Sequence, residues 1–303
     1  MLFVGISSFF NIMKIVNIIG GLGNQMFQYA LVVALHNKFQ ENVYVDTMMF
    51  DTYKVHNGLE LARIFDVTLL PASKSDLKRL TRFTKHFKLR RAYRKFLPPK
   101  KTECLEAKDY TYNESVLTDN SDRYYDGYWQ NWQYFERYAD QIRAIYRFKL
   151  PLSGQNQVLM VKLQNSTNSV SIHIRRSDYL KAKNYVGLCG LEYYVKAITY
   201  IRTRLNGEIH FLVFSDDMDW CKQYISPLLK NDQQTYVDWN QGASSYIDMQ
   251  LMSECCHNII ANSSFSWWAA WLNAHDDKIV VAPQKWTNTK VNCQIQMPEW
   301  ILF

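Results

Sequence analysis

Short apolar runs and longer amphipathic runs alternate along most of the chain. Close to its start, KIVNIIG (14–20) is an apolar run of strand length, and the glycine-containing stretch GLGNQ (21–25) follows it as a loop. The next segment, 26–39, has the length and apolar content of a helix, and NVYVD (42–46) has the pattern of a strand. This order predicts a right-handed β-α-β unit.

The second half of the chain repeats the alternation more regularly. Short apolar runs predict strands, and the amphipathic runs between them predict helices. The predicted strands are 169–175, 208–217, 234–239, 258–261 and 278–283, and the predicted helices are 191–205, 219–229, 245–256 and 263–274. Strands separated by helices imply a parallel sheet that is covered on both faces.

A stretch rich in turn-forming residues, near 150–168, separates the two halves. We therefore predict an α/β fold of two Rossmann-like domains that face each other across a cleft. The N-terminal domain is predicted at 13–155 and the C-terminal domain at 156–303. Ligands of open α/β sheets bind outside the carboxyl ends of the strands, so the residues that follow each predicted strand are the candidates for a site.

The net charge of +7 comes from one segment. Residues 74–101 hold 12 Lys or Arg and one Asp, a local charge of +11, which leaves −4 for the other 275 residues. Apolar residues recur there at helical spacing and predict one or two basic amphipathic helices before Pro98 and Pro99. Two interpretations stay open: a solvated helix pair that covers part of the core, or peripheral contact with an anionic membrane. Nucleic-acid binding is disfavoured, because no nucleic-acid motif accompanies the basic run.

Composition and cysteine spacing narrow the class of protein. With 48% hydrophobic and 15% aromatic residues, the chain has the composition of a globular protein and not of a disordered one. The six cysteines show no CxxC spacing and no pairing pattern, which disfavours structural zinc and a disulfide framework. Residues 1–12 are apolar but lack a basic region and a cleavage site, so we interpret them as an extension and expect a cytoplasmic protein.

His173, Arg175 and Arg176 stand at the end of the strand predicted at 169–175. Side chains alternate along a strand, so His173 and Arg175 share one face and Arg176 points to the other. A guanidinium forks across two phosphate oxygens and stays charged at any working pH, which favours Arg175 as a phosphate ligand. We expect Arg176 to pair with Asp178 or a neighbouring carboxylate in a structural role.

Three other strand ends carry candidate ligands. The glycine-rich GGLGNQ (20–25) fits neither a dinucleotide fingerprint nor a P-loop. The segment NSSFSWWAAWL (262–272) offers serine hydroxyls and a helix N-terminus to an anion, whereas its tryptophans are more typical of a core. In FSDDMDW (214–220), Asp217 and Asp219 could chelate a metal, accept hydrogen bonds from a base or ribose, or cap a helix. We favour the interpretation without a metal, because arginine already supplies positive charge for a phosphate.

Together, these strand ends predict a nucleotide-diphosphate site between two domains. No Ser-His-Asp set, zinc-ligand spacing or kinase signature competes with it in the sequence. From the residues alone, a metal-dependent transferase and a non-catalytic protein that binds nucleotides or glycans both stay open.

Over essentially its whole length from Met13, the sequence resembles glycosyltransferase family 11, the α-1,2-fucosyltransferases. The segments that carry the resemblance occur in the family's order: GGLGNQMFQYA (20–30), HIRRSDY (173–179), FSDDMDW (214–220) and NSSFSWWAAWL (262–272). The resemblance implies a two-domain GT-B fold and GDP-β-L-fucose as the donor. It also implies inverting transfer to O2 of a terminal β-galactoside, with no metal or other cofactor.

The resemblance further implies roles for individual residues. Arg175, His173 and Asn24 would act in catalysis: Arg175 on the β-phosphate of GDP, His173 near the ribose or the phosphates, and Asn24 close to the transferred sugar. The implied donor-binding residues are Gly21, Gly23, Asn24, His173, Arg175, Asp216, Asp217, Ser263, Ser264, Phe265 and Ser266. In YYDGYWQ, we take Asp126, Trp129 and Gln130 as candidates for acceptor binding.

Charge development suggests the mechanism. Rupture of the fucosyl bond places negative charge on GDP, so a cationic clamp on the leaving group lowers the barrier. We expect Arg175 and helix N-termini to supply that clamp, which leaves no obligatory place for Mg²⁺. The acceptor hydroxyl must lose a proton, and His173, Asp126 and the departing phosphate all stay open as the group that receives it.

Overall fold

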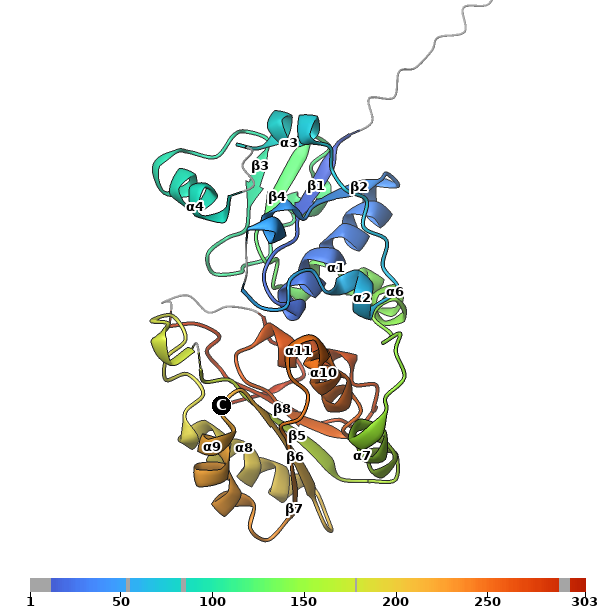
Figure 1. Cartoon of the computed structure of the whole chain (residues 1–303), viewed down its shortest axis with the longest axis vertical. Coiled ribbons are helices and arrows are strands. Elements are labelled where there is room, and N and C mark those ends of the chain that lie inside the picture. The colour runs from blue at the N-terminus through green and yellow to red at the C-terminus, as the bar shows by residue number, and fades with distance from the viewer. Residues whose placement is uncertain (1–11, 53–54, 83–85, 178, 289–294) are drawn as a thin grey trace, which may run out of the picture.

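The computed structural model describes residues 12–52, 55–82, 86–177, 179–288 and 295–303. Within these ranges, two parallel β-sheets each form part of an α/β domain, one above the other in Figure 1. The predicted class, an α/β fold of two Rossmann-like domains, is confirmed. The predicted extension, residues 1–12, lies outside the described residues except for Ile12.

The N-terminal sheet has four parallel strands in the order β2-β1-β4-β3. The strands are β1 (Lys14–Asn17), β2 (Val43–Asp46), β3 (Glu103–Leu105) and β4 (Arg123–Asp126). Helix α1 (Leu22–Phe39) connects β1 to β2, so the predicted β-α-β unit is confirmed. The apolar pattern does not predict β3 and β4, which lie in mostly polar stretches of the sequence.

Helix α1 begins at Leu22, earlier than the predicted start at Met26. Gly20 turns the chain with a φ of +92°, and Gly21 then serves as the extended N-cap. The N–H groups of Asn24 and Gln25 donate to the carbonyl oxygen of Gly21. Most of the expected loop is therefore the first turn of a helix, and Asn24 takes its position from that helix.

Short helical segments complete the N-terminal domain. They are η1 (Met48–Asp51), α2 (Leu61–Ile64), α3 (Lys74–Leu80), α4 (Phe87–Phe96), α5 (Ser115–Thr118), η2 (Trp132–Tyr134), η3 (Glu136–Tyr138) and α6 (Ala139–Ile145). The basic segment contains α3 and α4, as its helical spacing predicts, and α4 lies on the outer flank of the domain (Figure 1). Among the described helices, none is both long enough and apolar enough to cross a bilayer.

The C-terminal sheet has six parallel strands in the order β10-β9-β8-β5-β6-β7. They are β5 (Ser169–Ile174), β6 (His210–Ser215), β7 (Gln233–Val237), β8 (His257–Ile259), β9 (Val280–Ala282) and β10 (Ile301–Leu302). The five predicted strands are confirmed, and the two-residue β10 was not predicted. The chain runs from β5 to one side through β6 and β7, and then returns to place β8 on the other side of β5. Such a switch point is where open α/β sheets bind ligands.

Helices cover both faces of this sheet. They are α7 (Gly154–Gln164), η4 (Tyr179–Lys181), α8 (Leu191–Arg204), α9 (Met218–Trp220), a π-helical turn η5 (Cys221–Ile225), η6 (Ser226–Leu229), η7 (Gly242–Ser244), α10 (Tyr246–Ser253) and α11 (Ser264–Leu272). Helix α7 occupies much of the stretch that turn-forming residues mark as a boundary. It is held by the Asn156 side chain, which donates to Asn240 Oδ1 at 2.8 Å.

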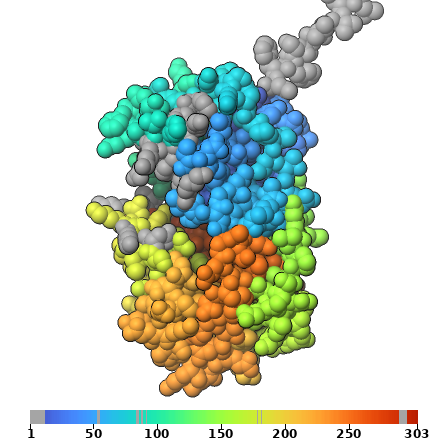
Figure 2. All heavy atoms as spheres, in the orientation of Figure 1, coloured from blue at the N-terminus to red at the C-terminus, as the bar shows by residue number. Residues whose placement is uncertain are grey.

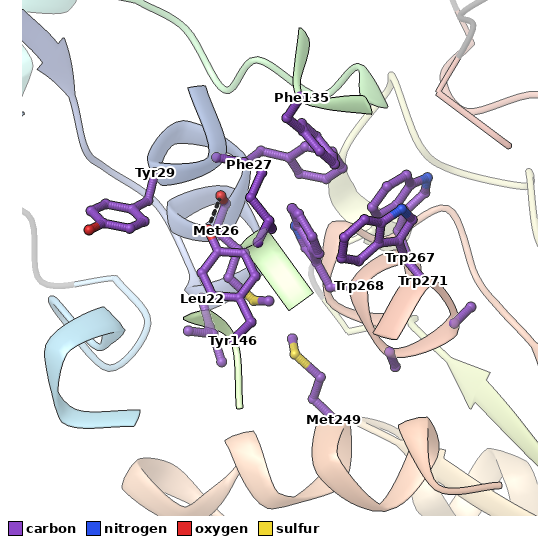
Figure 3. Close-up of a cluster of buried hydrophobic side chains, with 14 of the residues drawn as sticks. Leu22, Met26, Phe27, Tyr29, Phe135, Tyr146, Met249, Trp267, Trp268 and Trp271 are labelled. Carbon is purple, nitrogen blue, oxygen red and sulfur yellow. Dashed lines mark hydrogen bonds between the residues drawn. The ribbon is translucent and has the colours of Figure 1, made fainter. Parts of the chain in front are cut away.

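An aromatic core joins the two domains (Figure 3). Phe27 of α1 lies 4.7 Å from the ring of Trp267 and 4.8 Å from that of Trp268, between ring centroids. The indole N–H of Trp268 donates to the carbonyl oxygen of Gly23 at 3.0 Å, so a buried polar group is satisfied across the junction. Phe135 stacks on the same tryptophan at 5.4 Å. The tryptophans of α11 are thus core residues, as expected.

Candidate functional site

A cleft of about 720 Å³ lies between the domains, at the carboxyl ends of β5, β6 and β7. Figure 2 shows a hollow between the blue N-terminal half and the yellow and orange C-terminal half. Many of the residues singled out in the sequence line this cleft: Gly21, Gly23, Asn24, Gln130, His173, Arg175, Asp216, Ser263, Ser264 and Phe265. The structure therefore brings together strand ends from both domains.

The N-terminus of α1 approaches the N-terminus of α11 very closely. A Cβ on Gly23 would lie 2.5 Å from the backbone carbon of Ser264, so no larger residue fits without a shift of the backbone. Gly23 is therefore needed for contact between the domains. The glycines of this segment are therefore explained by close contact between the domains at least as well as by contact with a ligand.

Asn24 holds a hydrogen-bond network across the cleft. Its Oδ1 accepts from Ser264 Oγ at 2.8 Å and from Gln130 Nε2 at 2.6 Å. The indole N–H of Trp286 donates to Gln130 Oε1 at 3.1 Å. Two residues of the N-terminal domain and two of the C-terminal domain thereby fix one another at the cleft wall.

His173 is buried in the cleft wall, with 7% of its surface exposed, and its Nδ1 has no hydrogen-bond partner. Tyr194 donates to its backbone carbonyl, and Phe265 packs beside its ring at 5.9 Å. Burial, and then the positive charge of Arg175, lower the pKa of the His173 imidazole to about 3. The ring is therefore neutral at working pH and offers the cleft a hydrogen bond without a charge.

Arg175 lines the same cleft, and its Nε lies 3.2 Å from Asp216 Oδ2. The side chain keeps 30% of its surface exposed, so the guanidinium faces the cleft while one edge pairs with the carboxylate. Arg176 points elsewhere: its Nε donates to Asp217 Oδ2 at 3.0 Å, and its guanidinium lies 4.1 Å from the centre of the Trp220 ring. The predicted alternation and the pairing of Arg176 with a neighbouring carboxylate are confirmed. Asp178, the other partner considered, lies outside the described residues.

Asp217 has a structural role in this arrangement. One carboxylate oxygen pairs with Arg176, and the other accepts from the N–H of Trp220 at 3.2 Å, which caps the short helix α9. Asp217 does not line the cleft, whereas Asp216 does. In the described part of the chain, no group of three or more His, Cys, Asp or Glu side chains could hold a metal ion.

The serines of the segment 262–272 differ in position. Ser263 Oγ accepts from the N–H of Phe265 at 3.3 Å and caps α11. Ser264 reaches Asn24 across the cleft. Ser266 is fully buried and lies next to the carbonyl oxygens of the preceding turn, so the structure places it behind the cleft wall.

The three acceptor candidates also lie in different surroundings. Gln130 lines the cleft. Trp129, with a φ of +57°, turns its ring into the core, where it is 1% exposed and packs against Tyr134. Asp126 lines a smaller side pocket of about 240 Å³ together with Asn17, Ile19, Met49, Arg90, Arg94 and Tyr128. Tyr128 also lines the main cleft, so the two hollows adjoin.

Glu106, which the sequence does not single out, fixes the loop that carries Gln130. Its Oε2 accepts from the N–H of Tyr128 at 2.7 Å, and its Oε1 accepts from the N–H of Gln130 at 2.9 Å. Burial raises the pKa of Glu106 to about 7, against the opposing effect of these hydrogen bonds. The only sequence signal is a Glu whose partners lie more than twenty residues away, which no local pattern reveals.

Asp248 of α10 is a second cleft residue that the sequence analysis missed. Burial raises its pKa to about 7, although Asn240 Nδ2 donates to its Oδ1 at 2.8 Å. Phe214 and Val237, the apolar residues at the ends of β6 and β7, line the cleft with it. The available signal was one Asp within the mostly apolar run SYIDMQLM.

Comparisons with known proteins agree with this geometry. A model of glycosyl transferase family 11 matches residues 7–303. An α-1,2-colitosyltransferase of Escherichia coli is 35% identical over 88% of this chain and 90% of that protein. A galactoside α-(1,2)-fucosyltransferase 1 of Leontocebus fuscicollis is 26% identical over 85% of this chain and 64% of that protein.

Among solved structures, the fucosyltransferase NodZ from Bradyrhizobium shares the fold, with a TM-score of 0.51 at 14% identity over 86% of this chain and 92% of that chain. Two Rossmann-like domains around a cleft are the GT-B arrangement, as expected. The family match spans nearly the whole sequence, including part of the segment before Met13. The chain belongs to glycosyltransferase family 11.

Proposed function

We propose that this glycosyltransferase transfers L-fucose from GDP-β-L-fucose to O2 of a terminal β-galactoside, with inversion to an α-linkage. The observation that carries the proposal is the buried His173, whose Nδ1 lacks a partner beside the Arg175 guanidinium in the cleft. A buried polar atom without a partner is costly, so it favours a ligand that completes its hydrogen bond. A neutral donor or acceptor next to a cation suits a ribose hydroxyl or a phosphate oxygen.

The nucleotide fits the C-terminal wall of the cleft. The pyrophosphate would lie between Arg175 and the N-terminus of α11, where backbone N–H groups and the helix dipole favour an anion. The guanine would pack against Phe214 and Val237, with its N1–H and amino group directed at Asp248. Asp216, one of the donor-binding residues that the resemblance implies, would orient Arg175.

The reaction needs one bond to form and one to break. The acceptor oxygen attacks the anomeric carbon as the bond to the β-phosphate breaks, and the electron pair of that bond goes to the leaving GDP. Arg175 would neutralise the developing charge without a metal. With its low pKa, His173 is a weak base, and Asp126 points into the side pocket, so the departing phosphate is the favoured acceptor of the hydroxyl proton.

A second donor competes with fucose. The Escherichia coli relative at 35% identity is named for colitose, a sugar that differs from fucose by the absence of the 3-hydroxyl. A nucleotide-sugar site distinguishes the two only if it pairs that hydroxyl. A site that hydrogen-bonds a hydroxyl rejects the analogue lacking it by a large factor, whereas an indifferent site accepts both.

The test is GDP release with the purified chain. GDP-fucose, GDP-colitose and GDP-mannose are each offered with and without a soluble β-galactoside, in the presence and absence of a chelator. We expect release from GDP-fucose that depends on the acceptor and is unaffected by the chelator, and an α-1,2 linkage in the product by NMR. Release of GDP from GDP-colitose alone would make colitose, and not fucose, the transferred sugar. Loss of GDP release in the presence of the chelator would favour a metal-dependent mechanism.

A further inference from the structure

Helix α4 places Arg90 and Arg94 toward the protein. Arg90 Nη2 lies 3.0 Å from Asp126 Oδ1, and Arg94 Nη2 donates to Asp126 Oδ2 at 2.7 Å. The Arg94 guanidinium also contacts Glu103 at 3.0 Å. Only 11% and 23% of the two arginine side chains remain exposed. Arg90 and Arg94 are one turn apart, at i and i+4, and form a polar face of the helix. This face anchors α4 to the carboxylates of β3 and β4.

The apolar residues of the same helix point outward. Leu89, Tyr93 and Phe96 are spaced i, i+4 and i+7, so they form one stripe, and their exposed fractions are 47%, 40% and 75%. Phe96 is the most exposed large apolar side chain in the described part of the chain, and Leu97 extends the stripe at 43%. On this part of the helix, two arginines turn inward and three apolar side chains turn outward, which is the reverse of the usual pattern of a surface helix.

Exposed cations of the basic segment accompany this stripe. Lys95 is exposed, and its Nζ lies 5.4 Å from the centre of the Phe96 ring. Lys100 donates to the carbonyl oxygens of Lys78 and Arg79, which holds the end of the segment beside α3. Lys74, Lys78 and Lys101 are exposed as well. The surface combines a narrow apolar stripe with exposed lysines of the basic segment.

We propose that this face of α4 docks on an anionic lipid bilayer, with Phe96 and Leu89 in the interface and the lysines on the lipid headgroups. Both parts of the surface match that partner: apolar side chains enter the boundary between headgroups and acyl chains, and basic side chains attract anionic lipids. A stable protein interface buries roughly 800 Å² on each partner, and a stripe of four side chains covers much less area than that.

Docking there would orient the proposed reaction. The inner face of α4 supplies Arg90 and Arg94 to the side pocket that adjoins the main cleft. A bilayer against the outer face would therefore lie one helix away from this pocket. This last step rests on the proposed function, because docking would turn the acceptor side of the cleft toward glycans that are carried by lipid.

Vesicle flotation tests the proposal with the full chain. Vesicles of phosphatidylcholine are compared with vesicles in which about a third of the lipid is phosphatidylglycerol. We expect binding only to the anionic vesicles, weakened by salt, and a loss of about ten-fold or more in the double variant Leu89→Ser, Phe96→Ser. The matched control is Val158→Ser, Val161→Ser on α7, whose side chains are 59% and 53% exposed and which should bind like the unchanged protein.

Equal binding to both kinds of vesicle, or full binding by the double variant, would overturn the proposal. Dimers that form without lipid and disappear in the double variant would also overturn it and assign the stripe to a second copy. GDP release with a soluble acceptor should be unchanged in the double variant, which shows that it folds. Because flotation needs no catalysis, failure of the proposed reaction and failure of docking are read separately.

Discussion

Three titratable residues of the cleft differ in charge because their surroundings differ. Arg175 keeps its charge beside Asp216, and the imidazole of His173 is held neutral by burial. Asp248 has a pKa of about 7, so its carboxyl is poised between the two states. Each of these conditions can be tested at the residue concerned.

The pH dependence of GDP binding tests Asp248. A carboxylate that accepts the guanine N1–H must be ionised, so GDP affinity should rise about ten-fold per pH unit below 7 and level off above it. In Asp248→Asn, only the dependence that comes from the titration of GDP itself should remain, and affinity should fall by about ten-fold or more above pH 7. Calorimetric titration at several pH values measures both. GDP itself titrates in this range, so the variant serves as the baseline, and parallel curves for the two proteins would contradict the assignment.

Substitution of the two adjacent arginines separates catalysis from structure. Arg175→Ala should lower kcat by about 100-fold or more, because a charge contact to the leaving group is lost. Arg176→Ala removes the pair with Asp217 outside the cleft and should affect mainly stability. Steady-state kinetics and thermal unfolding of both variants decide the matter, and similar kcat values for the two would exclude the proposed clamp.

At the scale of elements, the loop that carries Gln130 depends on Glu106. The pKa of this residue is raised from 4.5 to about 7, so between these values the folded chain holds a proton that the unfolded chain has lost. The free energy of unfolding should therefore decrease as pH rises from about 4.5 to 7, by on the order of 3 kcal/mol, and stay level above.

Denaturant unfolding from pH 5 to 8 measures this contribution. In Glu106→Gln the decrease should be smaller, because the contribution of Glu106 is lost while that of Asp248 remains, and stability should fall overall because an amide N–H₂ now faces a backbone N–H. Asp248→Asn is the appropriate comparison, since Asp248 titrates in the same range. An unchanged pH slope in Glu106→Gln would show that its carboxyl titrates normally.

At the scale of the whole molecule, periodicity predicts most of the fold because β-α alternation leaves a strong local signal. It misses β3 and β4, which lie in mostly polar stretches of the sequence, and β10, which has only two residues. It also misses α7, whose first residues Gly154, Gln155 and Asn156 resemble a turn. The strand-end residues His173 and Arg175 could be predicted, since topology alone brings strand ends together. Asp248 and Glu106 could not, because their roles come from contacts far apart in the sequence. Trp129 shows the converse: an aromatic residue beside the site belongs to the core.

The aromatic core across the domain junction also determines how the enzyme can move. Phe27, Trp267 and Trp268 would have to leave one another if the domains swung apart about a hinge, which would expose apolar surface to water. We therefore expect the two halves to resist opening about a hinge and to move as one frame. The strand ends that line the cleft should then keep their relative positions while substrates come and go.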